Sequence, residues 1–461
     1  MRILTSMSRY TYDNNDIIYA LASAWGNSPI AVIRVSGDGS IKKFSELFSA
    51  SETLLKAFSH TIHYGKIIDP DSKEAVDEIL VAIFRDGRSY TGQESLEINC
   101  HGNIIGIEAI FKVLEKQGFR SAYPGEFTFR AFMNGKVDLT QAEAVMEIVN
   151  SQSEIAHSLA LKRLEGNLFN LINEIKIKVV DALAVIELQL DYEEDEIIDE
   201  THFPKEAIEG ALKRVESLLD TYTIGRLYSE GCRVVLAGST NTGKSTLFNL
   251  LLKEERSIVS EIHGTTRDYI EAKTHLEGIP ISLYDTAGLR DSKDSIEQEG
   301  IRRTRGLIKE SDLVLLVVDS SIDGYKLSPE EQILAKEEKT IVVCNKTDLG
   351  NVAVLEGSYP LSAKTAEGFK TLKEEIVKRL QKGSPKTDGS TVVIESARQK
   401  KELNRACEAL KHSLEYFKET LPLDIIAVEL NEALDALGSL SGEVTSEDIL
   451  ENIFSNFCVG K

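Results

Sequence analysis

The clearest chemical signature in this sequence is a short glycine-rich segment, residues 238–245 (GSTNTGKS). It fits the pattern G-x-x-x-x-G-K-[ST], follows an apolar run (VVLAG) and opens a helical one (STLFNLLLK). In such a loop backbone N–H groups surround phosphates, the lysine reaches the β and γ oxygens, and the last hydroxyl binds Mg²⁺. On this segment alone, a glycine-rich βα turn without a ligand is an alternative. The predicted phosphate-binding residues are Asn241, Thr242, Gly243, Lys244 (also catalytic), Ser245 (also a Mg²⁺ ligand) and Thr246.

Three further segments follow in the order that GTP-binding enzymes require. Residues 285–288 (DTAG) end an apolar run, so that Asp285 can hold Mg²⁺ through water while the Gly288 amide approaches the γ-phosphate. In residues 345–348 (NKTD), a carboxylate can accept hydrogen bonds from guanine N1–H and its exocyclic amine, a donor pair that adenine lacks. Either this segment or residues 362–364 (SAK) would alone be an ordinary turn, but together they predict a guanine site. The predicted GTP-binding residues of these three segments also include Thr286, Ala287, Asn345, Lys346, Asp348, Ser362, Ala363 and Lys364.

The usual water-orienting side chain is absent after Gly288. Leu289 stands where Ras-like enzymes have a glutamine. A nearby carboxylate can take this role, and Glu297 and Glu299 follow in the segment DSIEQEG. From the residues alone, either one is equally consistent with a solvated charge on a helix.

The chain of 461 residues is too long for a single domain of ordinary size. The pattern of apolar and polar residues along it predicts three parts. Residues 1–134 mix strand-like runs with a helical stretch, which indicates an α+β domain. Residues 230–384 alternate buried strand runs with helices, which predicts a Ras-like, doubly wound α/β domain. Residues 135–229 and 385–461 have helical periodicity, and segments flanking an inserted domain can pack as one helical domain.

Composition restricts the partners and the compartment. The net charge of -21 excludes coating of nucleic acid or anionic membrane by the whole surface, so any RNA contact must be local. The 5 cysteines form neither a paired framework nor a CxxC zinc spacing, which fits a reducing compartment. The sequence shows no signal-peptide pattern and no membrane-length apolar run, so we expect a cytoplasmic protein without membrane contact.

These segments, with others outside the nucleotide site, resemble the MnmE family, also called TrmE, of tRNA modification GTPases. The resemblance covers nearly the whole chain and includes SLEINCHG, SIVSEIHGTTRDYIE and DTAGLR. Two segments are specific to this family among GTPases: PGEFTFRAFMNGKVDLTQAEAV and the terminal FCVGK.

The resemblance implies details of the GTPase that the motifs alone do not give. Asn241, with backbone groups of Ser260, Ile262 and Thr265, resembles a K⁺ site beside the phosphates, where K⁺ plays the part of an arginine finger. Thr266 resembles the second Mg²⁺ ligand, and Glu297 falls where the family has its water-orienting glutamate. Such K⁺ sites form when two GTPase domains meet, so hydrolysis should depend on the cation and on dimerisation. The implied GTP-binding stretch comprises Ser260, Ile262, His263, Gly264, Thr265 and Thr266.

The resemblance also implies that the N-terminal domain dimerises and binds tetrahydrofolate, as 5-formyl- or 5,10-methylene-tetrahydrofolate. Arg34, Glu97, Lys136 and Lys461 match family positions that contact the folate. Without the family, Arg34 and Lys136 would be ordinary surface cations. The early loop SAWGNSP departs from the family's pattern, which affects this site. Cys458 is a candidate functional thiol, with a small apolar anchor residue as the alternative.

The resemblance implies that a homodimer joins an FAD-dependent MnmG-type partner in a heterotetramer. Together they would add a carboxymethylaminomethyl group at C5 of the wobble uridine, U34, in tRNA. The alternative is an RNA- or ribosome-associated assembly GTPase without modification chemistry. That class predicts a basic RNA-binding domain, whereas this chain ends in the acidic-to-neutral SEDILENIFSNFCVGK. A membrane-remodelling GTPase would need a basic amphipathic helix or a lipid signal, and the sequence shows neither.

Overall fold

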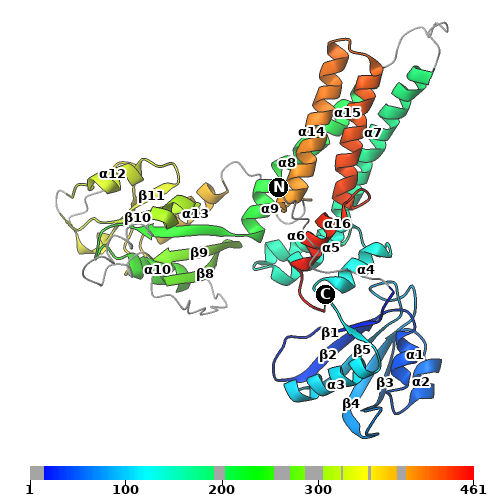
Figure 1. The fold of residues 1–461 in the computed structure, drawn as a ribbon. Helices are drawn as coiled ribbons and strands as arrows, with labels where there is room; N and C mark the ends of the chain where they lie inside the picture. The colour runs from blue at the N-terminus through cyan, green and yellow to red at the C-terminus, as the bar shows by residue number, and fades with distance from the viewer. Residues whose placement is uncertain are drawn as a thin grey trace, which may run out of the picture. The chain divides into compact units, whose positions relative to one another are not determined.

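The computed structural model describes residues 15–191, 203–253, 270–285, 305–322, 325–350, 355–381 and 391–460. They form two compact units, one drawn from Met1–Val149, Arg163–Ile208 and Ala409–Lys461, the other from Asn150–Lys162 and Glu209–Glu408. Each unit contains one sheet (Figure 1).

The sheet of the first unit has the order β3-β4-β5-β2-β1-β6. Neighbours are antiparallel except for the parallel pair β1 and β6. Alternate residues such as Ile79, Val81 and Ile83 of β4 are buried, because successive strand side chains point to opposite faces. They share a core with the apolar side of α3. The bounds are β1 (Ile18–Leu21), β2 (Ser28–Ser36), β3 (Thr61–Ile68), β4 (Ala75–Phe84), β5 (Ser95–Gly102), β6 (Arg120–Ser121), α1 (Ser40–Ser45), α2 (Ser51–Lys56) and α3 (Ile104–Lys116).

Helices from both ends of the chain complete the first unit. The 25-residue helix α7 packs against α15, although more than 200 residues separate them in the chain. The last helix, α16, packs on α4 through Phe454, whose ring meets that of Phe129 edge to face at 5.5 Å. The helices are α4 (Glu126–Met133), α5 (Leu139–Asn150), α7 (Asn167–Asp191), α15 (Leu423–Ser441) and α16 (Glu447–Ser455), with part of α14 (Ala397–Lys418).

The second unit is a doubly wound α/β structure. Its sheet has the order β12-β11-β10-β7-β9-β8, parallel except for β8 at one edge. All residues of β10 are buried; Leu315 belongs to a core that includes α10 and α13, and Leu316 to one that includes α12. The bounds are β7 (Cys232–Ala237), β8 (Ile270–Leu276), β9 (Ile279–Asp285), β10 (Leu313–Asp319), β11 (Thr340–Asn345), β12 (Tyr359–Pro360), α6 (Glu154–Leu164), α8 (Lys205–Asp220), α9 (Tyr222–Ser229), α10 (Lys244–Lys253), α12 (Pro329–Ala335), η2 (Thr347–Leu349) and α13 (Phe369–Leu380).

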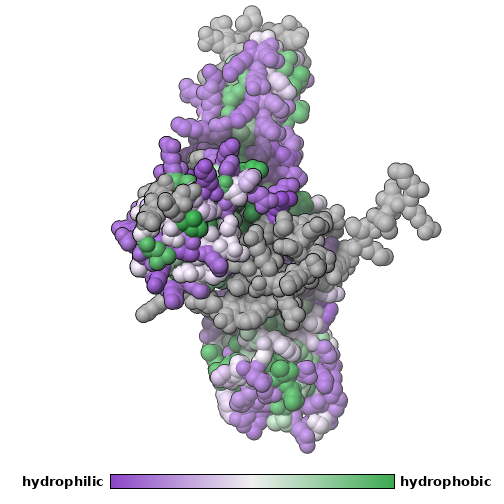
Figure 2. Space-filling view, turned by 90° about the vertical axis from the view of Figure 1, so that its left-hand side faces the viewer, coloured by the Kyte–Doolittle hydropathy of each residue, from purple (hydrophilic) through white to green (hydrophobic). Residues whose placement is uncertain are grey.

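The predicted combination of an α+β part, a discontinuous helical part and an inserted α/β part is confirmed. The predicted boundaries at residues 134, 229 and 384 stay predictions. No helix in the described ranges is long and apolar enough to cross a membrane. Hydrophilic residues cover most of the long helices on the face shown in Figure 2.

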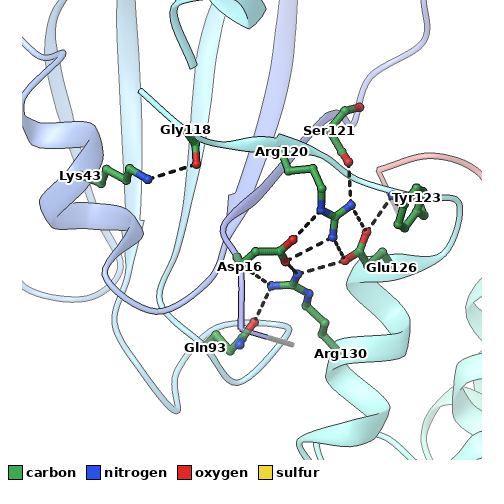
Figure 3. Close-up of polar contacts among 9 residues, drawn as sticks. All are labelled: Asp16, Lys43, Gln93, Gly118, Arg120, Ser121, Tyr123, Glu126 and Arg130. Atoms are coloured by element: carbon green, nitrogen blue, oxygen red, sulfur yellow. Dashed lines mark hydrogen bonds and ion pairs between the residues drawn. The ribbon is translucent and has the colours of Figure 1, made fainter. Parts of the chain in front are cut away.

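A buried ion-pair network fixes α4 to the edge of the first sheet (Figure 3). Arg130 and Glu126, both fully buried on α4, pair at 3.0 Å. Arg130 also donates to the Asp16 carboxylate at 2.5 Å, and Arg120 donates to Glu126 at 2.6 Å. Burial raises the pKa of Asp16, but hydrogen bonds from Arg120 and Arg130 outweigh burial and hold that pKa below its ordinary value. The network therefore joins α4 to β6 and to the segment before β1.

We expect Arg130→Met to destabilise the first unit by about 3 kcal/mol, because it removes Arg130 from the buried Glu126 carboxylate, which keeps Arg120 as its cationic partner. Urea unfolding of the full chain, followed by circular dichroism, measures the shift. Lys56→Met is the matched control, because it breaks an exposed pair with Glu52 on α2 and should change little. Equal midpoints for the two variants would contradict a stabilising role for this network.

Candidate functional site

The predicted nucleotide motifs meet at one edge of the second sheet. Strands β7, β9, β10, β11 and β12 run parallel, so the segments that follow them emerge at the same edge. β7 lies between β10 and β9, and the chain continues to opposite sides of it. Ligands of open α/β sheets bind at such a switch point. The sequence therefore places its glycine-rich loop, after β7, at this switch point, where open α/β sheets have their ligand crevice.

Two glycines give this loop its close approaches. Gly238 has a φ of +130°, and a Cβ there would lie 2.2 Å from the Val317 carbonyl oxygen of β10. Gly243 has a φ of +92°, and its Cβ would lie 2.2 Å from Nδ2 of Asn345. Asn241 adopts the left-handed conformation with a φ of +59° and is exposed. A Cβ at either glycine would push the loop away from the strands that support it.

The buried amide of Asn345 joins the two sides of the crevice. Its Nδ2 donates to the Thr242 carbonyl at 2.8 Å, and its Oδ1 accepts from the Ala363 amide at 2.9 Å. Both bonds are buried. One side chain therefore links the end of β11, the phosphate loop and the segment after β12.

The predicted base-binding residues lie together beside this amide. The Ser362 hydroxyl donates to Asp348 at 2.7 Å and accepts from the Thr365 amide at 3.2 Å. Asp348 is exposed, so its carboxylate also faces solvent, and Lys364 is exposed. Lys346, with a φ of +69°, donates to Asp319 at 2.6 Å. Burial raises the pKa of Asp319, but the Lys346 and Ser321 hydrogen bonds outweigh it and lower that pKa overall.

Two of the residues predicted to bind Mg²⁺, Ser245 and Asp285, lie next to each other. The Ser245 hydroxyl donates to the buried carboxylate of Asp285 at 2.8 Å. A hydroxyl and a carboxylate oxygen are hard ligands of the kind that Mg²⁺ prefers, so this pair fits the ion. The Lys244 ammonium donates to the carbonyls of Gly238 and Ser239 at 3.0 and 2.7 Å, inside the phosphate loop. Thr246 lies exposed on the first turn of α10.

Sequence reasoning missed Glu331, which supports the phosphate loop from α12. Its carboxylate accepts from the Ser239 hydroxyl at 2.9 Å and from Tyr325 at 3.0 Å, and it forms a capping box with Ser328. Burial and Glu331 together raise the pKa of Tyr325 to about 12. The capping-box spacing (SPEE) was a readable signal for a helix start. The contact across 92 residues with Ser239 had no signal in the sequence.

Several predicted residues lie outside the described part of the chain, and their predicted roles stay predictions. These include the candidate water-orienting Glu297 and its alternative Glu299. The others are Ser260, Ile262, His263, Gly264, Thr265, Thr266, Thr286, Ala287, Gly288 and Lys461.

A second candidate site lies in the first unit. Arg34 of β2 faces Glu97 of β5 in register and pairs with it at 2.9 Å. Arg34 also donates to the Gly460 carbonyl at 3.1 Å, which brings the C-terminal tail to this pair. Lys136 donates instead to the Gly87 carbonyl at 3.1 Å. Cys458 is exposed, and the neighbouring Phe457 is the buried residue.

Comparisons with known proteins agree with this geometry. The family described as "MnmE helical domain" matches residues 139–458, and "GTP-binding protein TrmE N-terminus" matches residues 17–136. The "tRNA modification GTPase MnmE" of Borrelia recurrentis is 41% identical over 99% of this chain and 100% of that protein. The protein of the same name from Treponema denticola is 40% identical over 98% of this chain and 99% of its own length.

The chain belongs to the MnmE family of tRNA modification GTPases. The resemblance predicted from the motifs is thereby confirmed, and the chain is a GTP hydrolase that acts in tRNA modification.

The substitution Gly243→Ala tests the link between the phosphate loop and Asn345. The new Cβ would displace Nδ2 of Asn345, and a buried polar group left without its partner costs about 2 kcal/mol. We therefore expect GTP affinity, measured by fluorescent-nucleotide titration, to fall by roughly 30-fold.

Gly357→Ala is the matched control in the same domain. Gly357 also has a positive φ, of +75°, but nothing lies within 4 Å of its Cβ position. Both substitutions strain the backbone, but Gly243→Ala also disturbs the side-chain amide of Asn345, whereas Gly357→Ala does not. Equal affinities in the two variants would contradict the role given to Asn345.

Proposed function

We propose that this chain is a potassium-dependent GTPase that modifies tRNA with an FAD-dependent MnmG-type partner. Together they add a carboxymethylaminomethyl-type group at C5 of the wobble uridine, U34, of certain tRNAs. The main support is that Asn345 links the predicted phosphate loop to the predicted base-binding loop. In addition, the chain aligns over nearly its whole length with a tRNA modification GTPase. The tetrahydrofolate cofactor supplies the one-carbon unit, as its 5-formyl or 5,10-methylene form.

The described residues divide the binding of GTP between two ends of the crevice. At one end, Asp348 accepts hydrogen bonds from the guanine N1–H and exocyclic amine, while Ser362 holds the carboxylate in place. At the other end, Lys244 and the loop amides hold the β and γ phosphates. Ser245 and Asp285 would hold Mg²⁺ together with Thr266, which lies outside the described residues, and the ion would offset the charge of the phosphates.

The proposed K⁺ site lies on the phosphate loop. Asn241 is exposed in a left-handed conformation, so its side chain is available to a cation beside the phosphates. The backbones of Ser260, Ile262 and Thr265 would complete the ligand set. A positive charge there stabilises the charge that develops on the transferred phosphoryl group. Glu297 orients the attacking water in place of the missing glutamine.

GTP hydrolysis in potassium and in sodium buffer tests the catalytic part of the proposal. We expect wild-type hydrolysis to be faster in potassium by about 10-fold or more, since an arginine finger contributes more than that. Glu297→Ala should remove this stimulation without removing GTP binding. Glu299→Ala is the matched control and should keep it. Equal rates in both salts, or an unaffected Glu297→Ala variant, would contradict the assignment.

The Arg34–Glu97 pair fits a folate. A pterin ring presents a guanine-like edge of N–H donors to the Glu97 carboxylate, and the glutamate tail of the folate needs a cation. Arg34 or Lys136 would supply that cation, and the C-terminal tail reaches Arg34 through the Gly460 carbonyl. Lys461 is the next residue of that tail, and Cys458 is an exposed thiol close to it in the chain.

We expect Arg34→Ala to weaken tetrahydrofolate binding by about 10-fold or more, because a charged hydrogen bond contributes roughly 1.5–3 kcal/mol. Isothermal titration with 5-formyltetrahydrofolate measures the affinity, and GTP hydrolysis should be unchanged. Lys66→Ala is the matched control, since Lys66 and Glu78 form another cross-strand pair, at 3.2 Å, in the same sheet. Unchanged folate affinity in Arg34→Ala would remove Arg34 from the site.

The proposed assembly is a homodimer that joins the FAD-dependent partner in a heterotetramer. The first sheet offers an apolar surface for a second copy, because Ile62, Tyr64 and Leu80 are exposed on one face of β3 and β4. GTP binding brings the two GTPase domains together, and hydrolysis releases them. This cycle would pass a conformational change to the tRNA-modifying parts of the complex.

A further inference from the structure

A cluster of cations marks the start of α14 in an otherwise acidic chain. Arg398, Lys400, Lys401 and Arg405 lie within the segment ARQKKELNR, whereas the whole chain carries a net charge of -21. We call the exposed Lys400 and Lys401, together with the half-buried Arg405, the α14 basic face. Charged residues on a helix usually form a solvated surface on which both signs are balanced. The start of α14 is mainly basic, so this usual explanation does not apply to it.

The α14 basic face borders a hollow in the second unit. The hollow has a volume of about 350 Å³, and its lining consists of Ala397, Lys400, Lys401, Asn404, Arg405 and Glu408. The Lys400 ammonium lies 4.4 Å from the centroid of the Tyr222 ring of α9. The Ile394 amide donates to the Thr221 hydroxyl at 3.2 Å, which ties the start of α14 to α9. The cations therefore all lie on α14, and the segment before this helix is fixed to the start of α9.

The ion pairs of this face leave its two lysines uncompensated. Arg405 pairs with the buried Glu402 at 2.5 Å. Among the described residues, no carboxylate lies within ion-pair distance of Lys400 or Lys401. Glu408 is the one acidic side chain among the residues of the described ranges that line the hollow. The face therefore carries a net positive charge.

Helix stability does not account for these cations. The positive end of a helix dipole is its N-terminus, where acidic residues stabilise and basic residues destabilise. The first turn of α14 contains no acidic residue, and Lys400 and Lys401 follow directly after it. Glu395, a buried acidic residue, lies two residues before the helix start. The attraction of this face for an anion therefore rests on the two lysines and not on the helix dipole.

We propose that the α14 basic face binds the phosphate backbone of tRNA. Family membership shows that the protein acts in tRNA modification, and a chain of net charge -21 repels a polyanion over most of its surface. Backbone contacts must therefore concentrate on local cations. Lys400 and Lys401 contact phosphates, while Tyr222 presents an aromatic ring beside them. This contact depends on the tRNA activity of the family and on neither the K⁺ nor the folate proposal.

The test is binding of the full chain to a fluorescent, unmodified tRNA transcript with uridine at position 34, measured at several KCl concentrations. The variant is Lys400→Gln/Lys401→Gln. We expect its affinity to fall by about 10-fold near 0.1 M salt. The slope of log affinity against log salt should decrease by about 1.5, since each phosphate contact contributes roughly 0.7–0.9. GTP hydrolysis and the unfolding midpoint should match wild type.

The matched control is Lys370→Gln/Lys378→Gln, which removes two exposed lysines from α13 in the same unit. It changes net charge equally and should keep tRNA affinity and salt slope. Wild-type binding by the α14 variant, or an equal loss in the control, would overturn the proposal. An α14 variant that keeps tRNA but loses the FAD-dependent partner would assign the face to protein contact instead. Competition by millimolar inorganic phosphate would assign it to a small phosphorylated ligand.

Discussion

The side-chain amide of Asn345 is the interaction on which the described half of the nucleotide site depends. It is buried, and it bonds both the phosphate loop and the segment after β12. A buried amide that loses a partner costs about 1–3 kcal/mol, so this arrangement strongly favours one relative position of the two loops. Gly243 makes the approach possible, since any side chain there would meet the amide. The proposed base and phosphate sites are therefore positioned by the same side chain.

Other polar contacts support this arrangement from neighbouring elements. Glu331 holds the Ser239 hydroxyl from α12, and Asp319 at the end of β10 holds Lys346. Tyr325 also donates to Glu331, at 3.0 Å. The proposed GTP-binding loops are thus attached to the strands and to α12. A change in loop position on hydrolysis would reach α12 through Glu331.

The sequence predicted the parts of the site that follow from local order along the chain. Motifs after successive parallel strands must emerge at one sheet edge, so the proximity of Ser245 and Asp285 and of Asp348 and Ser362 was predictable. The bridge made by Asn345 was not, because it depends on the register of β11 against β10 and on a glycine 102 residues earlier. Arg34 and Glu97 were each predicted from the family, but their pairing is a property of the β2–β5 register. The network of Asp16, Glu126 and Arg130 also had no signal, because buried and exposed charges look alike in a sequence.

We propose that GTP hydrolysis in the second unit drives tRNA modification. A reconstitution tests this directly, with the proposed FAD-dependent partner, the proposed tetrahydrofolate one-carbon donor, glycine or ammonium as the source of the amino group, and unmodified tRNA. Mass spectrometry of the nucleosides would follow U34 with GTP or with a non-hydrolysable GTP analogue. If hydrolysis drives the reaction, we expect C5-modified U34 with GTP and little or none with the analogue. Equal modification with both nucleotides would contradict it.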